Sequence, residues 1–267
     1  MGDKTSIGWT DATWNPVTGC TKVSQGCKNC YAERVFPRAY GKDRKFTDVR
    51  CHLGRLDQPL RWKKPRRIFV NSMSDLFHED VPAKFIDRVF AVMCAADQHI
   101  YQILTKRPQT MLEYMSAAWT PDGIDEVKTT MKYPSGCQRS NLTWPPEHVH
   151  LGVSVENQET ANERIPILLQ TPAAVRFISY EPALGPLNVF RWFDGPHQQT
   201  RGKRLDWIIC GGESGPHARI MEIEWLRSIV EQCQAACVPI FVKQDSGKKA
   251  GQQGRIPNDL WIKEFPK

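Results

Sequence analysis

The stretch Ile68-Phe69-Val70-Asn71-Ser72-Met73-Ser74-Asp75 joins a short apolar run to a run of polar side chains. Its first three residues are β-branched or aromatic, as is typical of strands buried on both faces of a parallel sheet. After Asp80 and Pro82, apolar residues repeat at helical spacing, at Phe85, Ile86, Val89, Phe90 and Met93. A buried strand, a polar end and an amphipathic helix form the repeating unit of α/β folds.

The same unit recurs along the chain. Similar apolar runs occupy residues 101–105, 149–155, 175–180, 207–211 and 240–243. Helical spacing returns at Leu226, Ile229, Val230 and Cys233, and more weakly from Asn157 to Gln170, where Pro166 is expected to break or kink the helix. Alternating strands and helices predict a parallel sheet with right-handed crossovers. We therefore expect an α/β fold, a partial or near-complete parallel (β/α) barrel of about six to seven units, with a doubly wound open sheet as the alternative.

Length and composition indicate an ordinary globular protein. We expect a single domain over residues 1–267, with insertions near 116–148 and 191–205, because 24% charged and 10% aromatic residues exclude a wholly disordered chain. No apolar run approaches the roughly 18 residues that span a bilayer, and the N-terminus lacks the apolar core of a signal peptide. The expected location is cytoplasmic, without membrane association, and with reduced thiols. Cys94, Cys210 and Cys233 lie in apolar patterns and are expected in the core.

Positive charge is concentrated in the first quarter of the chain. The net charge is +7, and residues 1–67 hold 15 Lys and Arg against 6 Asp and Glu. The densest piece is Arg61-Trp62-Lys63-Lys64-Pro65-Arg66-Arg67. A basic segment with an aromatic residue suits a phosphate backbone and stacked bases, so a nucleic acid or a nucleotide is the expected partner. A solvated linker before a strand is the alternative interpretation.

Three of the nine cysteines lie close together in the pattern C-x6-C-x2-C, at Cys20, Cys27 and Cys30. Three thiolates on one loop can hold three irons of a 4Fe–4S cluster and leave the fourth iron open. A structural zinc is the first alternative, with its fourth ligand from Cys51 or His52. The second alternative is a redox-active C-x-x-C pair of Cys27 and Cys30, but this alternative gives Cys20 no role.

Several motifs occur in order between Trp9 and Gln244. They are Trp14-Asn15-Pro16-Val17-Thr18-Gly19-Cys20 with Cys27-x-x-Cys30-Tyr31-Ala32-Glu33, Asn71-Ser72-Met73-Ser74-Asp75-Leu76-Phe77, Leu104-Thr105-Lys106-Arg107-Pro108, Gly152-Val153-Ser154-Val155-Glu156-Asn157, Ser179-Tyr180-Glu181-Pro182 and Gly211-Gly212-Glu213-Ser214-Gly215. Together they resemble a phage- and prophage-associated three-Cys-motif family that is described as radical-SAM-like. The first gap of six residues differs from the common radical-SAM spacing of three.

The resemblance implies a radical S-adenosylmethionine (SAM) barrel in which Cys20, Cys27 and Cys30 ligate a 4Fe–4S cluster whose open iron binds S-adenosyl-L-methionine. An external donor would reduce the cluster, and a 5′-deoxyadenosyl radical would then abstract hydrogen from a substrate. The candidates for binding the methionyl amine and carboxylate follow the second strand, at Asn71, Ser72, Ser74 and Asp75. The candidates for the ribose hydroxyls are Ser154 and Glu156.

Titratable side chains at other strand ends would face the same mouth of such a barrel. Lys106, Glu181, Glu213 and Lys243 are candidate catalytic residues that could bind a phosphate or donate protons, with structural ion pairs as the alternative. Tyr180 is a candidate hydrogen donor to a substrate radical, with simple packing as its alternative.

The predicted function is an iron–sulfur, SAM-dependent radical enzyme that acts on nucleic acid or a nucleotide. Two alternatives stay open: a zinc-stabilised nucleic-acid-binding module, and a non-catalytic barrel that docks a protein partner. The row of polar strand ends favours the enzyme, because a binding module needs no such row inside a barrel mouth.

Overall fold

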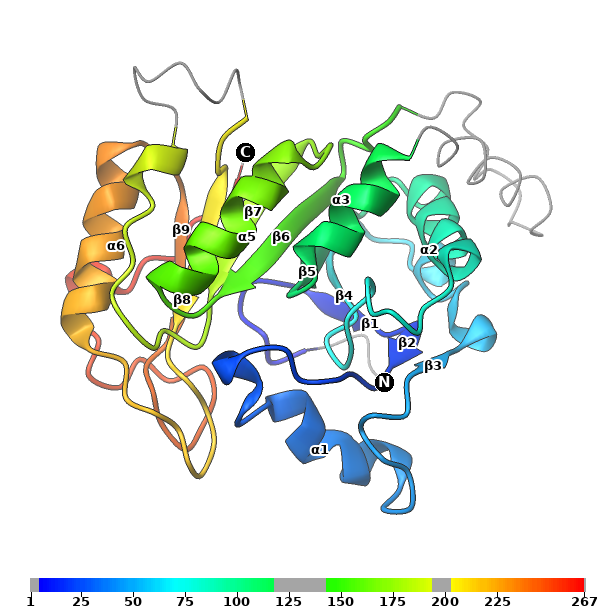
Figure 1. Cartoon of the computed structure of the whole chain (residues 1–267), viewed down its shortest axis with the longest axis horizontal. Helices are drawn as coiled ribbons and strands as arrows, with labels where there is room; N and C mark the ends of the chain where they lie inside the picture. The colour runs from blue at the N-terminus through cyan, green and yellow to red at the C-terminus, as the bar shows by residue number, and fades with distance from the viewer. Residues whose placement is uncertain (1–4, 118–142, 194–202, 267) are drawn as a thin grey trace.

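The structure is a computed structural model that describes residues 5–117, 143–193 and 203–266. At its centre lies a seven-stranded parallel sheet that curls into a half-barrel (Figure 1). Its strands are β1 (Ala12–Trp14), β4 (Arg67–Val70), β5 (Ile100–Thr105), β6 (Val149–Val155), β7 (Val175–Tyr180), β8 (Trp207–Gly211) and β9 (Ile240–Gln244). They lie side by side in chain order. The predicted partial barrel is confirmed, and the doubly wound alternative is wrong, because such a sheet reverses its strand order.

Within the described residues, four helices cover the outer face of the sheet, and a fifth lies apart from them (Figure 1). The four are α2 (Ala83–Ala95), α3 (Pro108–Ser116), α5 (Gln158–Gln170) and α6 (Ile223–Ala235). Helix α1 (Tyr31–Tyr40) crosses the edge where the strands end. A short antiparallel ribbon of β2 (Val17–Thr18) and β3 (Arg50–Cys51) lies beside β1.

The two faces of the sheet bury different sets of side chains. Alternate residues of β6, from Val149 to Val155, pack in the main core between the sheet and its helices. The inner face carries a separate aromatic cluster of Trp9, Phe177, Trp207, Ile209 and Phe241. Gly152 makes room for this cluster, since a Cβ there would lie 2.6 Å from the Phe177 ring. The aromatic cluster fills the inside of the half-barrel towards the beginnings of the strands.

Two prolines lie inside helices, and one of them, Pro166, was expected to break or kink its helix. Helix α1 continues past Pro37 to Tyr40, because the Phe36 ring packs on Tyr40 and Phe46, with centroids 4.7 and 5.3 Å apart. Helix α5 continues past Pro166 to Gln170. Its buried face after the proline, Leu168 and Leu169, packs in the main core. In both helices tertiary packing outweighs the lost backbone hydrogen bond.

Parts of the expected insertions, residues 118–142 and 194–202, lie outside the described residues. The expectation of a single domain remains a prediction. Among the described helices, none has the length and apolarity needed to cross a bilayer. Cys94, Cys210 and Cys233 are buried as predicted.

Candidate functional site

A cavity of about 1040 Å³ occupies the half-barrel at the ends of its strands. Eleven of the fourteen predicted site residues line it: Cys20, Cys27, Cys30, Asn71, Ser72, Ser74, Asp75, Lys106, Ser154, Glu181 and Lys243. The other three, Glu156, Tyr180 and Glu213, lie outside its lining. Residues far apart in sequence therefore converge on one space.

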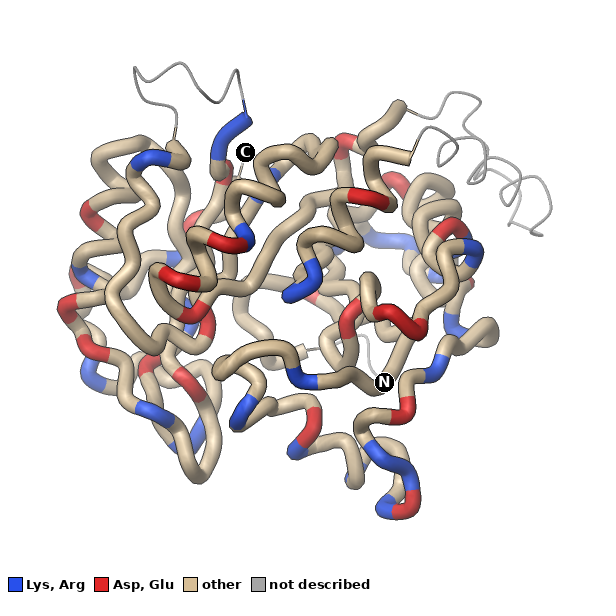
Figure 2. Tube along the Cα trace, in the orientation of Figure 1, with Lys and Arg blue, Asp and Glu red and all other residues tan. Residues whose placement is uncertain are grey.

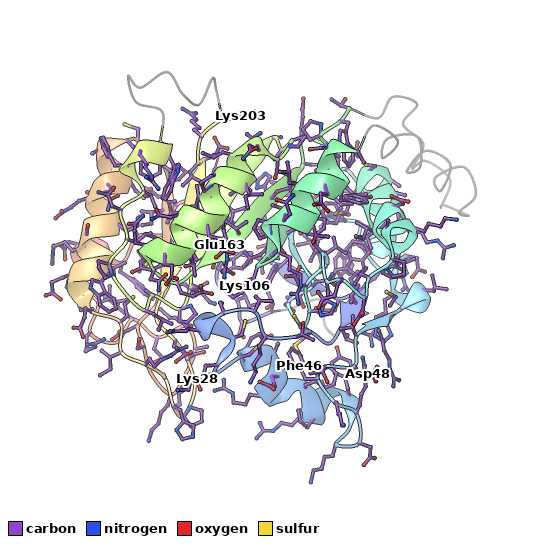
Figure 3. All side chains as sticks on the ribbon, viewed as in Figure 1. Lys28, Phe46, Asp48, Lys106, Glu163 and Lys203 are labelled. Carbon is purple, nitrogen blue, oxygen red and sulfur yellow. The ribbon has the colours of Figure 1, made fainter. Side chains whose placement is uncertain are left out.

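The three cysteines belong to one segment, residues 19–30, which we call the cysteine loop. It begins against β4, where Gly19 N donates to the Met73 carbonyl at 3.2 Å. It ends at Cys30, the residue that precedes α1. In Figure 3, Lys106 lies at the lower edge of the sheet, above the ribbon that carries Lys28 of the loop. The loop thus runs across the mouth of the half-barrel.

The three cysteines are half-buried, and positive groups lie next to two of them. Burial raises the pKa of Cys20 to about 12, although Arg107 Nη1, which lies 3.7 Å from its sulfur, opposes the shift. Burial also raises the pKa of Cys30, and the backbone amides of Glu33 and Ala32 at the start of α1 oppose it. Such thiols stay protonated alone, but binding of a metal deprotonates them. Arg107 was quoted within a strand-end motif but was not identified as a site residue from the sequence.

Glu156, which follows β6, binds the cysteine loop from outside the cavity lining. Its carboxylate accepts from Ser24 Oγ at 2.8 Å and pairs with Lys106 Nζ at 3.0 Å and Arg164 Nη1 at 3.3 Å. A Cβ on Gly26 would lie 2.3 Å from Glu156 Oε1, so the loop backbone needs glycine at this approach. The carboxylate is engaged by protein groups instead of facing the cavity, where the predicted ribose hydroxyls would lie.

Glu213 holds the other side of the same loop. Glu213 Oε2 accepts from Asn29 Nδ2 at 2.9 Å and from the Arg219 backbone amide at 2.9 Å. Arg219 in turn donates to the Gln25 carbonyl at 3.1 Å. The hydrogen bonds from Arg219 and Asn29 lower the pKa of Glu213 against the effect of its burial. The structure therefore places Glu213 behind the loop as a positioning group, not at the predicted catalytic rim.

The end of β4 presents polar groups to the cavity. Asn71, which has a left-handed φ of 61°, accepts at Oδ1 from Val17 N at 3.1 Å. Its Nδ2 atom is buried and has no partner among the described residues. Ser72 Oγ donates to Asn15 Oδ1 at 3.2 Å, and Ser74 Oγ donates to the Val17 carbonyl at 2.9 Å. Asn71 thus lines the cavity and carries a buried amide nitrogen without a hydrogen-bond partner among the described residues.

The Asp75 carboxylate forms hydrogen bonds with other groups of the protein. Its carboxylate accepts from Thr105 Oγ1 at 2.7 Å, from Lys106 N at 3.1 Å and from Arg107 Nη1 at 3.3 Å. These contacts fix the start of the segment after β5. Asp75 therefore holds the Lys106 backbone amide and the Arg107 guanidinium beside the cysteine loop.

Lys243 and Glu181 form an ion pair on the cavity wall, at 3.0 Å from Nζ to Oε1. Ser179 Oγ donates to the other carboxylate oxygen of Glu181 at 3.1 Å.

Tyr180 points away from the cavity, since neighbouring residues of a strand face opposite sides of a sheet. It is fully buried in the main core, and its hydroxyl donates to the Gly185 carbonyl. The packing interpretation of Tyr180 thus fits the structure, and the predicted role as hydrogen donor does not.

The residues suggested for a zinc site lie elsewhere. Cys51 pairs with Val17 in the β2–β3 ribbon, and His52 Nε2 contacts Thr18 Oγ1 at 2.7 Å. Neither residue lines the cavity. Among the described residues, no three His, Cys, Asp or Glu side chains are grouped as ligands of one ion. This finding includes Cys20, Cys27 and Cys30, which line one cavity without forming such a group, so their role as cluster ligands stays a prediction.

Comparison with known proteins agrees with this architecture. A scan of protein families matches residues 4–259 to the family described as protein of unknown function DUF5131. The chain belongs to this family. A search of curated proteins finds no match.

Two solved structures are similar to the chain. A cysteine-to-serine mutant of spore photoproduct lyase has 11% identity and a TM-score of 0.52 over 88% of this chain and 76% of that one. Spore photoproduct lyase complexed with dinucleoside spore photoproduct has 12% identity and a TM-score of 0.43 over 82% of this chain, which spans 60% of that protein. The first likeness shows the fold, an α/β partial barrel shared with spore photoproduct lyase.

Proposed function

We propose that the chain is an iron–sulfur, SAM-dependent radical enzyme that acts on nucleic acid or a nucleotide. One observation carries this proposal: the three thiols of one loop line the same cavity as the unpaired amide of Asn71. The radical-SAM-like fold supports it.

Cys20, Cys27 and Cys30 would hold the 4Fe–4S cluster. When bound and reduced, the cluster supplies an electron to SAM, which cleaves to methionine and a 5′-deoxyadenosyl radical that abstracts hydrogen. Arg107 lies 3.7 Å from the Cys20 sulfur and would stabilise the negative charge of the thiolates. The start of α1 does the same at Cys30, because a helix N-terminus favours negative charge.

The end of β4 would bind the methionyl part of SAM. Asn71 Nδ2 suits the carboxylate, because a buried donor without a partner gains a hydrogen bond when an acceptor arrives. Ser72 and Ser74 lie next to it on the cavity wall, and Ser154 lines the cavity from β6 as the candidate for the ribose. Asp75 would act through the Arg107 guanidinium and the Lys106 backbone amide, which it binds.

Lys106, Lys243 and Glu181 would face the substrate. Each lysine is held by a carboxylate, Lys106 by Glu156 and Lys243 by Glu181, both at 3.0 Å. Their ammonium groups can bind a phosphate, and Lys243 can transfer a proton to or from Glu181. Tyr180 takes no part in this site, because it packs on the other face of the sheet.

Charge supports a phosphate-bearing substrate. Among the residues that line the cavity, Lys22, Arg67, Lys106, Arg107, Lys243 and Lys263 are cationic, and Asp75 and Glu181 are the anionic ones. Figure 2 shows further Lys and Arg along the cysteine loop and α1, interspersed with acidic residues. Lys22, Arg67 and Lys106 pair with carboxylates outside the lining, those of Glu33, Asp11 and Glu156, which reduces the excess of positive charge that would attract an anion. The external electron donor, the cytoplasmic location and the phage association stay predictions.

Single cysteine variants test the proposal. After anaerobic reconstitution with iron and sulfide, Cys20→Ala, Cys27→Ala and Cys30→Ala should each lose the cluster. Cys51→Ala should keep its full iron content, because Cys51 lies in the β2–β3 ribbon away from the cavity. A full cluster in all three loop variants, or zinc dependent on Cys51, would contradict the proposal.

A further inference from the structure

The cavity extends beyond the groups assigned to the cluster and to SAM. On the β9 side its lining includes Trp261, Lys263 and Phe265 from the C-terminal segment, together with Phe241 and Lys243 of β9. We call the part bounded by these five residues and Glu181 the C-terminal chamber. The sequence analysis assigned no role to residues 261–265.

The C-terminal segment is attached to β9 by an isolated antiparallel bridge between Lys263 and Phe241. Val242 N donates to the Ile262 carbonyl at 2.9 Å, and Glu264 N donates to the Ile240 carbonyl at 3.0 Å. Because side chains two residues apart on an extended segment share a face, Trp261, Lys263 and Phe265 all line the cavity. The segment is fixed further by Trp207 Nε1, which donates to the Glu264 carbonyl at 2.9 Å. These hydrogen bonds therefore fix the C-terminal segment that forms the chamber wall.

The chamber carries an excess of positive charge. Lys243 is paired with Glu181 at 3.0 Å. Lys263 Nζ lies 3.4 Å from the centroid of the Trp261 ring and 4.6 Å from that of Phe241, and it donates to the Val242 carbonyl. Within the described part of the chain, no carboxylate lies within ion-pair distance of Lys263. Two ammonium groups thus share one carboxylate.

The same space is lined by aromatic rings. Phe69 of β4, Phe241 and Phe265 contribute to the cavity wall, and the Phe265 and Phe241 centroids are 5.3 Å apart. Lys263 is an exposed residue, and the protein atoms packed around its ammonium lower its pKa to about 8. Ammonium groups beside apolar rings suit a ligand that combines an anion with a planar ring.

We propose that the C-terminal chamber binds a nucleotide, with Lys243 and Lys263 holding its phosphate and the rings of Phe69, Phe241 and Phe265 forming the wall against its base. This inference rests on the proposed function and names the substrate class of the same cavity. The nucleotide can be free or part of a strand, since both present the same phosphate and base.

Binding to the full-length protein tests the chamber separately from the cluster. Nucleoside monophosphates and, in a second arm, single-stranded oligonucleotides are titrated by calorimetry into the wild type and into the cluster-free Cys30→Ala variant. We expect both proteins to bind, with Lys263→Gln weakening the affinity about tenfold or more and Lys263→Arg restoring most of it. The tighter-binding arm identifies the source of the nucleotide.

Lys249→Gln is the matched control, because it removes the same charge from an exposed lysine outside the cavity lining. It should bind like the wild type. The proposed nucleotide site would be contradicted if Lys263→Gln bound the nucleotide as tightly as the wild type. It would also be contradicted if Lys249→Gln lost as much affinity as Lys263→Gln. If the wild type bound no iron but still bound nucleotide in a Lys263-dependent way, the proposed radical-enzyme function would be contradicted. The proposed nucleotide site would then still be supported.

Discussion

Asn29 Nδ2 lies 2.9 Å from Glu213 Oε2, so a carboxylate beyond the end of β8 holds the residue just before the last cysteine of the loop. Glu156, beyond the end of β6, makes the equivalent contact with Ser24 at 2.8 Å. Two buried carboxylates from different strands thus fix the cysteine loop over the cavity. This makes the spacing of the three thiols a property of the whole half-barrel.

Glu213→Gln should lower cluster occupancy without unfolding the protein. The amide would place a donor against Asn29 and Arg219, and the lost contacts are worth about 1–3 kcal/mol. Iron per chain after reconstitution, with the melting temperature measured alongside, checks this. Glu224→Gln, an exposed position on α6, is the control. An iron content equal to that of wild type would show that Glu213 does not position the loop.

Gly26→Ala should displace the cysteine loop from Glu156. The added methyl group would meet Glu156 Oε1 at 2.3 Å, and relieving such overlap costs about 1–3 kcal/mol. Gly54→Ala is the matched control, because nothing lies within 4 Å of a Cβ at that position. We expect the first variant to lose iron and the second to keep it. The same iron content in both would contradict this account of Gly26.

Asn71→Asp should weaken SAM binding about tenfold or more, because it replaces the unpaired donor with an anion. Asp keeps the acceptor used by Val17 N and tolerates the left-handed backbone. Equilibrium dialysis with labelled SAM on reconstituted protein gives the affinity. Asn157→Asp should bind normally, since Asp caps α5 as well as Asn does. An unchanged affinity of Asn71→Asp for SAM would show that Asn71 does not bind SAM.

Acid should destabilise the protein through His150. Burial lowers its pKa from 6.5 to about 4, with His148 as a smaller cause, so the folded state favours the neutral ring. The unfolded chain takes up a proton below about pH 6.5, and stability is therefore lost as the pH falls from 6.5 to about 4. The loss is at most about 3 kcal/mol.

Urea unfolding at several pH values measures this loss. His150→Gln should make the free energy of unfolding less dependent on pH in that window, whereas the exposed His217→Gln should not. Equal slopes for wild type and His150→Gln would refute the assignment.

The strands were predictable because each is a short, self-contained apolar run. Residues 149–155 and 175–180 were predicted as strands and form β6 and β7 with these same bounds. The helix ends were less predictable, because Pro37 and Pro166 have a local cost that is outweighed by contacts made elsewhere in the chain. For Tyr180 a usable signal was present: Ser179 and Glu181 could share the cavity face only if Tyr180 pointed away.

The roles of the carboxylates could not be predicted from the sequence. Glu156 and Glu213 follow strand ends, as the sequence indicates, but their partners Ser24 and Asn29 lie more than a hundred residues away. Lys263 was missed because its segment has no strand-like pattern and is placed only by pairing with β9. Such contacts depend on the assembled half-barrel and not on local sequence.

The central claim is that Cys20, Cys27 and Cys30 hold an open-site cluster that binds SAM. The most direct test is the electron paramagnetic resonance spectrum of the reduced, anaerobically reconstituted protein, recorded before and after addition of SAM. We predict about four irons per chain and a spectrum that shifts on addition of SAM. Zinc in place of iron, or a cluster signal that SAM leaves unchanged, would contradict the claim.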